Sequence, residues 1–202
     1  MTSGRRTSAT LDMLLTSLLA TTGELSGYQF ASLLSEPIPL IWPVKHSQIY
    51  PALSALETRG DIVGQWIEQR GRPNKKVYKL SDQGRDRLVD WLLQKRKAIS
   101  EDEMMLITYN IALIGSKVVR EAVASYRLQC QMEMEQLEER WTNAVPASHE
   151  RASPDTTLTL KLTGVRTIYE FALSARRARI EWCESMLDRS EATVRAALEA
   201  SE

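Results

Sequence analysis

Residues 45–80 concentrate the side chains whose types and spacing could do chemistry. In the first part of this stretch, cations and hydrogen-bonding groups follow one another closely: Lys45, His46, Ser47, Gln48, Tyr50 and Ser54. Short or planar polar groups of this kind fit a major groove, where they meet base edges and phosphates. The stretch therefore predicts contacts to double-stranded DNA; for His46, a solvent-exposed loop position is the alternative interpretation.

A second group of cations lies toward the end of the same stretch. Four positive charges fall within seven positions, with no acidic residue among them: Arg70, Arg72, Lys75 and Lys76. Such a cluster suits the phosphate backbone of DNA better than a protein core. Taken alone, a basic cluster is more often a solvated turn, so its interpretation depends on the elements around it.

Catalytic and metal-binding chemistry has little material in this sequence. The chain holds two histidines, His46 and His149, and two cysteines, Cys130 and Cys183, that lie far apart. It has no phosphate-binding glycine loop and no His or Cys pair at metal-ligand spacing. We expect no enzyme activity, no metal and no cofactor. Buried thiols are the favoured interpretation of the cysteines, with a disulfide or a redox switch as the alternative.

The first polar group lies on a predicted helix that runs from Ser47 to Gly60. Ser47 is a typical N-cap, and Pro51, which lacks an N–H, is tolerated only near a helix start. Apolar residues repeat along the helix at intervals of four and three positions: Ile49, Leu53 and Leu56. One face is therefore predicted to be core and the other to carry the polar groups, as in a recognition helix that meets DNA with its first turns.

A hairpin is predicted directly after this helix. Residues 62–67 are β-prone, residues 71–74 have turn chemistry, and residues 75–80 alternate apolar with basic side chains. The four cations of the second group lie at the tip of this hairpin. A helix followed by a basic hairpin is the order of a winged helix-turn-helix domain.

Two shorter helices are predicted before the recognition helix. The first covers about residues 10–21 and ends at Gly23, and Ser26 caps the second. Tyr28, at the start of the second helix, is predicted to hydrogen-bond a phosphate, with burial of its ring in the core as the alternative.

These motifs resemble the PadR family of transcriptional regulators. The resemblance rests on the string Ile49-Tyr50-Pro51-Ala52-Leu53 with Gly71-Arg72-Pro73 downstream, and it covers roughly Leu14 to Leu93. It implies a DNA-binding regulator, most often a repressor, whose long helical C-terminal domain dimerises. Asp61 departs from the apolar residue that such chains commonly carry after the glycine, which bears on how the wing packs.

Charge and helical pattern divide the chain near residue 98. Residues 1–98 hold 14 Lys or Arg against 9 Asp or Glu, and residues 99–202 hold 12 against 17. The basic half would be attracted to phosphate and the acidic half would stay away from it. The sequence thus predicts a mostly α protein with a small β-hairpin: a winged helix-turn-helix domain over 1–98 and a helical dimerisation and effector domain over 99–202.

Two long helices with apolar faces are predicted in the C-terminal half, one over about residues 116–143 and one after Pro154. Because this half offers no large domain to cover those faces, a homodimer on a palindromic operator is expected. The resemblance also implies a small aromatic effector at these helices, with four aromatic residues as its expected contacts: Tyr126, Trp141, Tyr169 and Trp182. Dimer-core packing is the alternative for each, and effector-independent regulation or a helical adaptor are the alternatives for the whole chain.

Composition is ordinary for a globular protein. The chain has 202 residues, of which 43% are hydrophobic and 26% charged. No run approaches the roughly 18 apolar residues of a membrane span, and the N-terminus has no long apolar segment. A cytoplasmic protein without a membrane partner is expected.

Overall fold

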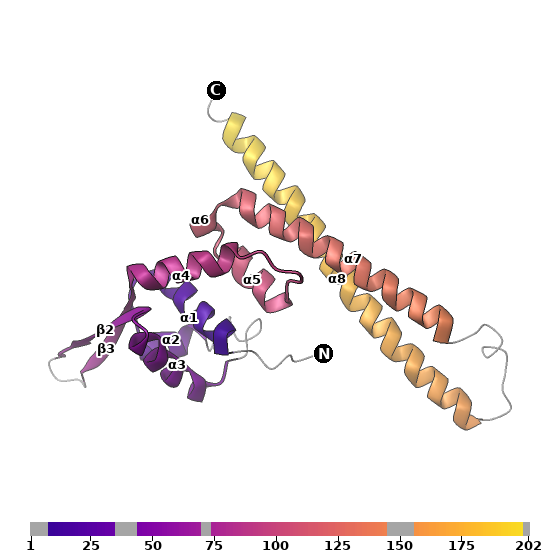
Figure 1. The fold of residues 1–202 in the computed structure, drawn as a ribbon, viewed down its shortest axis with the longest axis horizontal. Helices are drawn as coiled ribbons and strands as arrows, with labels where there is room; N and C mark the ends of the chain where they lie inside the picture. Colours follow the sequence, from indigo (N-terminus) through magenta and orange to yellow (C-terminus); the bar gives the residue numbers. More distant parts are fainter. Residues whose placement is uncertain (1–7, 35–43, 70–73, 145–155, 200–202) are drawn as a thin grey trace. The chain divides into compact units, whose positions relative to one another are not determined.

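The structure, a computed structural model, describes four segments of the chain: residues 8–34, 44–69, 74–144 and 156–199. Within them the chain is mostly helical, with one small antiparallel sheet (Figure 1). It divides into two compact units, Met1–Val119 and Arg120–Glu202, each with its own packing. Over the described segments, no helix has both the length and the hydropathy of a membrane span. The predicted fold class, a winged helix-turn-helix domain followed by helices, is confirmed.

Helix α1 (Ser8–Thr22) packs against much of the first unit, including α3, α4 and α5. Its leucines, which repeat at helical spacing, are buried: Leu14, Leu15, Leu18 and Leu19. Gly23 ends the helix with a φ of 88°, which L side chains rarely adopt, and its N–H donates to the Leu19 carbonyl at 2.9 Å. The predicted first helix and its glycine stop are confirmed.

A capping box starts α2 (Gly27–Leu33), which follows the short strand β1 (Leu25–Ser26). The backbone N–H of Gln29 donates to Ser26 Oγ at 3.3 Å, and Gln29 Oε1 accepts the Ser26 N–H at 2.8 Å. Backbone donors at the helix start are thereby satisfied. The predicted Ser26 cap is confirmed.

Helix α3 (His46–Thr58) begins earlier than the sequence predicts. Its N-cap is Lys45 and not Ser47, because Gln48 Oε1 accepts the Lys45 backbone N–H at 3.2 Å and holds that residue at the helix start. Ser47 therefore lies in the first turn, and Pro51 lies inside the helix. The predicted apolar stripe is confirmed, since its three members are buried: Ile49, Leu53 and Leu56.

Strands β2 (Ile62–Ile67) and β3 (Lys75–Leu80) form the predicted hairpin, called the wing from here on. The sheet order is β1-β3-β2 and both pairings are antiparallel, so β1 anchors β3 on its other edge. In Figure 1 the far end of the wing extends beyond the helices of the first unit. The predicted turn falls mostly on residues 70–73, which lie outside the described residues.

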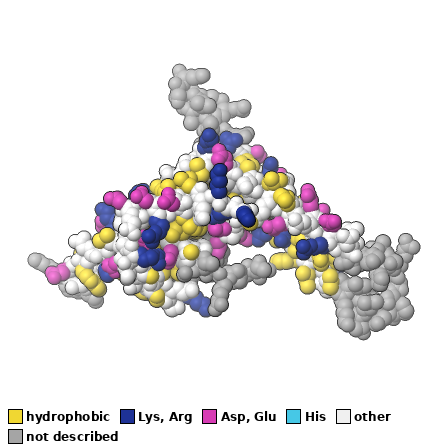
Figure 2. Space-filling view, viewed as in Figure 1, with side chains coloured by type: hydrophobic (Ala, Val, Ile, Leu, Met, Phe, Trp, Pro, Cys, Tyr) yellow, Lys and Arg dark blue, Asp and Glu magenta, His cyan; other side chains and the backbone are white. Residues whose placement is uncertain are grey.

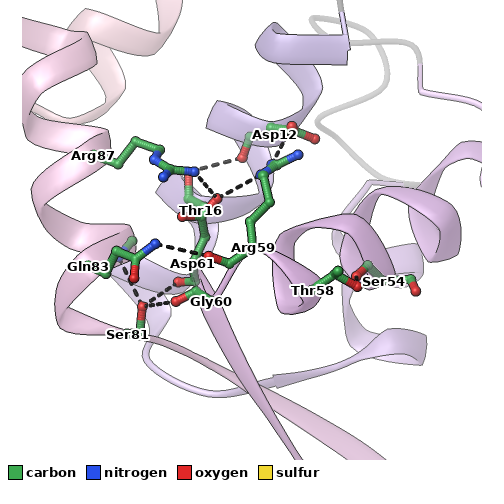
Figure 3. Close-up of polar contacts among 11 residues, drawn as sticks. Asp12, Thr16, Ser54, Thr58, Arg59, Gly60, Asp61, Ser81, Gln83 and Arg87 are labelled. Carbon is green, nitrogen blue, oxygen red and sulfur yellow. Dashed lines mark hydrogen bonds and ion pairs between the residues drawn. The ribbon is translucent and has the colours of Figure 1, made fainter.

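Asp61, which departs from the pattern of the family that the sequence resembles, is 1% exposed and lies between α3, β2 and α4 (Asp82–Leu93). Its Oδ2 accepts from Arg59 Nε at 3.1 Å and from Arg87 Nη1 at 2.9 Å (Figure 3). Arg59 Nη2 also donates to Asp12 Oδ2 of α1 at 2.7 Å, and burial raises the pKa of Asp12 despite this partner. A buried carboxylate is tolerable when cations pair with it. Ion pairs thus join the base of the wing to α1 and α4.

A close backbone contact also holds α4 against the start of β2. Ser81 Oγ accepts the Gly84 N–H at 2.9 Å as the N-cap of α4, and the same hydroxyl donates to the Gly60 carbonyl at 2.6 Å. A Cβ at Gly84 would lie 1.9 Å from the Asp61 carbonyl oxygen. The approach of these two segments therefore requires glycine at position 84.

Helices α5 (Glu101–Tyr109) and α6 (Ile111–Ile114) complete the first unit. Between them, the buried Asn110 donates from Nδ2 to Ser17 Oγ of α1 at 2.8 Å. Because α5 packs on α1, the compact unit extends to Val119, past the domain boundary placed at residue 98 from the sequence.

The second unit consists of α7 (Ser116–Ala144) from Arg120 onward and of α8 (Thr156–Glu199). Two contacts show that the helices are antiparallel: Glu133 pairs with Arg176 at 3.2 Å, and further along α7 the Trp141 ring centroid lies 5.1 Å from that of Tyr169, which comes earlier in α8. The predicted connecting loop covers residues 145–155, outside the described residues.

The two cysteines lie on these two helices. Cys130 of α7 and Cys183 of α8 are free thiols and both are buried. Burial raises the pKa of Cys183 to about 11, with a smaller contribution from Cys130 nearby. The predicted buried thiols are confirmed, and neither is activated toward the thiolate.

Candidate nucleic-acid interface

The side of α3 opposite its buried stripe carries polar groups at the surface. The six predicted contact residues of this region are all exposed: Lys45, His46, Ser47, Gln48, Tyr50 and Ser54. Ser47, Ser54 and Thr58 follow at intervals of seven and four residues, which places them on one side of the helix. Thr58 Oγ1 donates to the Ser54 carbonyl at 2.9 Å (Figure 3), which leaves its oxygen to accept a further bond. This side of α3 can offer hydroxyl and amide groups to a groove.

Gln48 has two roles that compete. Its Oε1 accepts the Lys45 N–H as part of the helix start, as described above. Bidentate reading of adenine by glutamine needs both the amide oxygen and the amide nitrogen. A contact made only through Nε2, as a donor to a guanine or thymine oxygen, would keep the helix cap intact. The geometry therefore favours Gln48 as a donor.

Tyr50 joins the start of α3 to the start of α2. A Cβ at Gly27 would lie 2.6 Å from Tyr50 Cε1, so the ring lies directly on the glycine backbone. The centre of the His46 ring is 5.7 Å from that of the Tyr50 ring, and Tyr50 remains 47% exposed. Tyr28, the neighbour of Gly27, is 79% exposed. The structure thus brings Tyr28 to the same region as the first turns of α3, and its alternative as a core residue does not apply.

The cations of the wing divide into groups with different surroundings. Lys75 is exposed at the start of β3, whereas Lys76 Nζ lies 2.7 Å from Glu57 Oε2 of α3. The hydrogen bond to Glu57 raises the pKa of Lys76. Arg70 and Arg72 lie outside the described residues. The role of Lys75 as a phosphate contact stays a prediction, and Lys76 already has an anionic partner within the chain.

Two residues of this region were not singled out from the sequence. Glu57 is the α3 residue that binds the wing, and Trp66 of β2 is 66% exposed. The sequence signal for Trp66 was its spacing along the strand: Ile62, Gly64 and Trp66 are two residues apart, so they lie on the same face. Glu57 carries no comparable signal, since its partner is distant in the sequence.

The four aromatic residues predicted to contact an effector do not form one site within the chain. The rings of Trp141 and Tyr169 are in contact, as given above. Tyr126 lies 15 residues before Trp141, about 22 Å away along α7, and Trp182 lies about 20 Å from Tyr169 along α8. Tyr126 is buried and Trp182 is half-buried. A small aromatic compound that contacts Trp141 and Tyr169 would therefore not reach Tyr126 or Trp182.

Comparison with known proteins yields a consistent set of relatives. A family model described as the Transcriptional regulator PadR-like family matches residues 14–90. The negative transcriptional regulator PadR of Bacillus subtilis (strain 168) is 33% identical over 172 residues, which cover 82% of this chain and 89% of the relative. A crystal structure of Bacillus subtilis PadR with operator DNA has 27% identity, a TM-score of 0.41, and coverage of 89% of this chain and 97% of that one. Its complex with p-coumaric acid has 28% identity, a TM-score of 0.39, and coverage of 90% and 99%.

Proposed function

The chain belongs to the PadR-like family of transcriptional regulators, and from this premise we propose that it binds a palindromic operator as a cytoplasmic homodimer and represses transcription until a small aromatic compound releases it. The observation that carries the proposal is the exposed polar side of α3 beside a basic wing within one compact unit. Family membership places the chain among regulators and not among enzymes.

DNA recognition would begin with the first half of α3 in a major groove. Ser47, Gln48 and Ser54 are within reach of base edges or phosphates there, and Lys45 precedes the helix where a cation would face the backbone. Tyr28 would bind a phosphate beside them. Lys75, with Arg70 and Arg72, would bind phosphates flanking the groove.

A dimer is supported by the apolar side chains that the second unit leaves at the surface. They lie on both long helices: Leu128, Met132, Leu160, Val165, Ile168 and Phe171. Covering them with a second copy would remove apolar surface from water, and a two-fold dimer would present two α3 helices to half-sites about 34–36 Å apart, one turn of the duplex, or a multiple of it. Simultaneous engagement of two half-sites would then raise the affinity.

An effector site is supported by the contact between Trp141 and Tyr169 and by the relative from Bacillus subtilis, which has been crystallised with p-coumaric acid. An effector acts only through its different affinities for two states. Lowering operator affinity about a hundredfold requires it to favour the DNA-incompetent dimer by about 2.7 kcal/mol. Regulation without an effector is the second candidate, because each of these rings is also explained as packing between α7 and α8.

The test is a footprint on the promoter region beside the protein's own gene, repeated over a range of salt concentrations and with a panel of aromatic acids. A protected palindrome with salt-dependent affinity, lost on adding one acid, is the expected result. If the palindrome is protected but no compound alters the protection, the protein is a DNA-binding regulator and the proposal of an aromatic effector is rejected. Absence of any protected sequence and of any duplex binding would favour the helical adaptor.

A further inference from the structure

One face of the wing is turned toward α3. In the register of β2 with β3, Gly64 lies opposite Tyr78 and Trp66 lies opposite Lys76. Side chains alternate between faces along a strand, so these positions share one face. Tyr78 is buried on it, and Lys76 reaches Glu57 of α3 from it. We call this the α3 face of the wing.

An ion pair crosses the α3 face at a position where β2 has no side chain. A Cβ at Gly64 would lie 2.4 Å from Glu57 Oε1 and 2.5 Å from Lys76 Cε. The glycine therefore gives the pair the space it occupies. With Glu57 and Lys76 side chains 31% and 26% exposed, the pair is partly shielded from water. Because Glu57 and Lys76 are 19 residues apart in the sequence and their charged atoms lie 2.7 Å apart, the ion pair links the recognition helix to the wing.

The same lysine holds Trp66. Lys76 Nζ lies 5.9 Å from the centre of the Trp66 ring and 5.5 Å from that of Tyr78, distances at which a cation is attracted to an aromatic face. Tyr78 lies inward and Trp66 outward along the wing. The inner ring is buried, whereas the indole is left 66% exposed. A large amphipathic side chain is thus held at the surface on the α3 face, whereas the exposed cation Lys75, which pairs with Ile67, lies on the other face of the wing.

We propose that Trp66 contacts the sugar–phosphate backbone of bound DNA and that the Glu57–Lys76 ion pair is a positioning device which holds it there. The inference rests on the proposed DNA-binding function. The indole ring would cover a deoxyribose and its Nε1–H would donate to a phosphate oxygen, because tryptophan offers an apolar body with one donor. DNA is the occupant that the charge of the hairpin favours, since residues 66–76 of the sequence hold four cations, Arg70, Arg72, Lys75 and Lys76, against one acidic residue, Glu68.

The assignment changes the role expected of Lys76. A lysine that binds a phosphate releases counterions, so its removal makes the salt dependence of binding shallower by about one unit. A lysine neutralised by Glu57 contributes little to that dependence, and its removal acts through the position of the wing. The Trp66 contact is uncharged and sequence-independent, so it strengthens specific and non-specific binding alike.

The first experiment measures binding of the full-length protein to a non-specific duplex of about 30 base pairs, long enough for two half-sites, over a series of salt concentrations. Trp66→Ala is expected to lower affinity about tenfold with an unchanged salt slope, and Trp66→Phe to lose less. Because Trp66 is exposed, the variant should keep the wild-type melting temperature. Affinity within about twofold of wild type would overturn the proposal. Failure of the wild-type protein to bind any duplex would instead remove the DNA-binding function itself.

A second measurement needs no variant in the bound protein. With 5-fluorotryptophan incorporated at the five tryptophans, the resonance that disappears in Trp66→Phe belongs to Trp66. Its shift should change on saturation with the duplex, and an unchanged resonance would contradict a contact. A change of oligomeric state in Trp66→Ala, measured by sedimentation, would assign the residue to a protein interface and overturn the proposal.

The positioning role of the ion pair is tested by changing Glu57, the partner of Lys76. Glu57→Gln removes a negative charge, so it should strengthen DNA binding if Lys76 contacts phosphate and weaken it if the pair holds the wing. We expect weakening by about the same factor as in Lys76→Met, with the salt slope unchanged in both. Lys75→Met is the matched control on the same strand and should lose about one unit of slope. Stronger binding by Glu57→Gln would overturn the positioning role.

Discussion

The two compact units of this chain treat their apolar residues differently. In the winged unit, the aliphatic side chains that form the apolar stripes of α1, α3 and α5 are buried, although Tyr28, Tyr50 and Trp66 stay exposed, and caps close the starts of α2, α4 and α5. In the two-helix unit, large apolar side chains stay at the surface of α7 and α8, and Figure 2 shows hydrophobic groups exposed on the molecule's visible face. A unit that covers its own core can fold by itself, whereas an exposed apolar ridge gains free energy when another surface covers it. The difference supports a division into a reader of DNA and a part completed by association.

The largest effect on stability is expected from truncating the chain on either side of α5, at residue 98 or at Val119. A chain ending at residue 98 loses three buried side chains of α5, each worth about 1.5–3 kcal/mol, which is comparable to the whole stability of a small domain. They are Met104, Leu106 and Ile107. We expect this chain to lack a cooperative thermal transition by circular dichroism, and a chain ending at Val119 to keep one. Cooperative melting of both chains would show that α5 is dispensable and that the boundary lies near residue 98.

A smaller effect should follow from closing the contact between α4 and β2. Gly84→Ala places a Cβ against the Asp61 carbonyl, and overpacking of this kind costs about 1–3 kcal/mol. The control is Gly164→Ala on α8, where a Cβ meets nothing within 4 Å and alanine favours the helix by about 0.5–1 kcal/mol. Urea unfolding should show loss of stability in the first variant and none in the second; equal midpoints would remove the packing argument.

The association of the second unit can be broken from its exposed face. Ile168 and Phe171, 69% and 56% exposed, are the side chains we would charge by Ile168→Glu with Phe171→Glu. If a second copy covers them, dimer affinity should fall at least about a hundredfold, near 2.7 kcal/mol. The reason is that burying the two introduced carboxylates in the interface would remove their hydration. Sedimentation equilibrium would show a monomer with unchanged helix content. A dimer of wild-type affinity would place the interface on another face.

The smallest effect concerns a cap within the winged unit. Burial raises the pKa of Glu103, but hydrogen bonds from Ser100 and the Arg96 guanidinium outweigh it and hold the pKa below the ordinary value of 4.5. A carboxyl whose folded-state pKa is lowered adds stability above the unfolded-state value and loses it as pH falls through the folded-state value. Glu103→Gln should therefore cost about 1 kcal/mol at neutral pH, and the difference from wild type should shrink as the pH falls below 4.5 and vanish once it is below the folded-state pKa. A difference that persists in acid would assign the effect to packing.

Local signals were sufficient for much of the winged unit. Ser26 caps α2 and Gly23 ends α1, as their positions in the sequence indicated. These elements depend on residues within a few positions, so a pattern of caps, stops and apolar spacing contains the required information. The start of α3 was misplaced because the cap depends on the Gln48 side chain. Gln48 Oε1 accepts the Lys45 N–H, so the helix starts after Lys45 and not after Ser47.

The sequence by itself determined the fold class, the recognition helix with its buried stripe, the wing and the family, because these follow from spacing along the chain. Only the tertiary structure decided that Asp61 pairs with Arg59 and Arg87. It also decided that Glu57 pairs with Lys76 and that α5 packs on α1. The physical reason is that ion pairs, close backbone contacts and domain limits join residues distant in sequence. Their partners become neighbours only after the helices have packed.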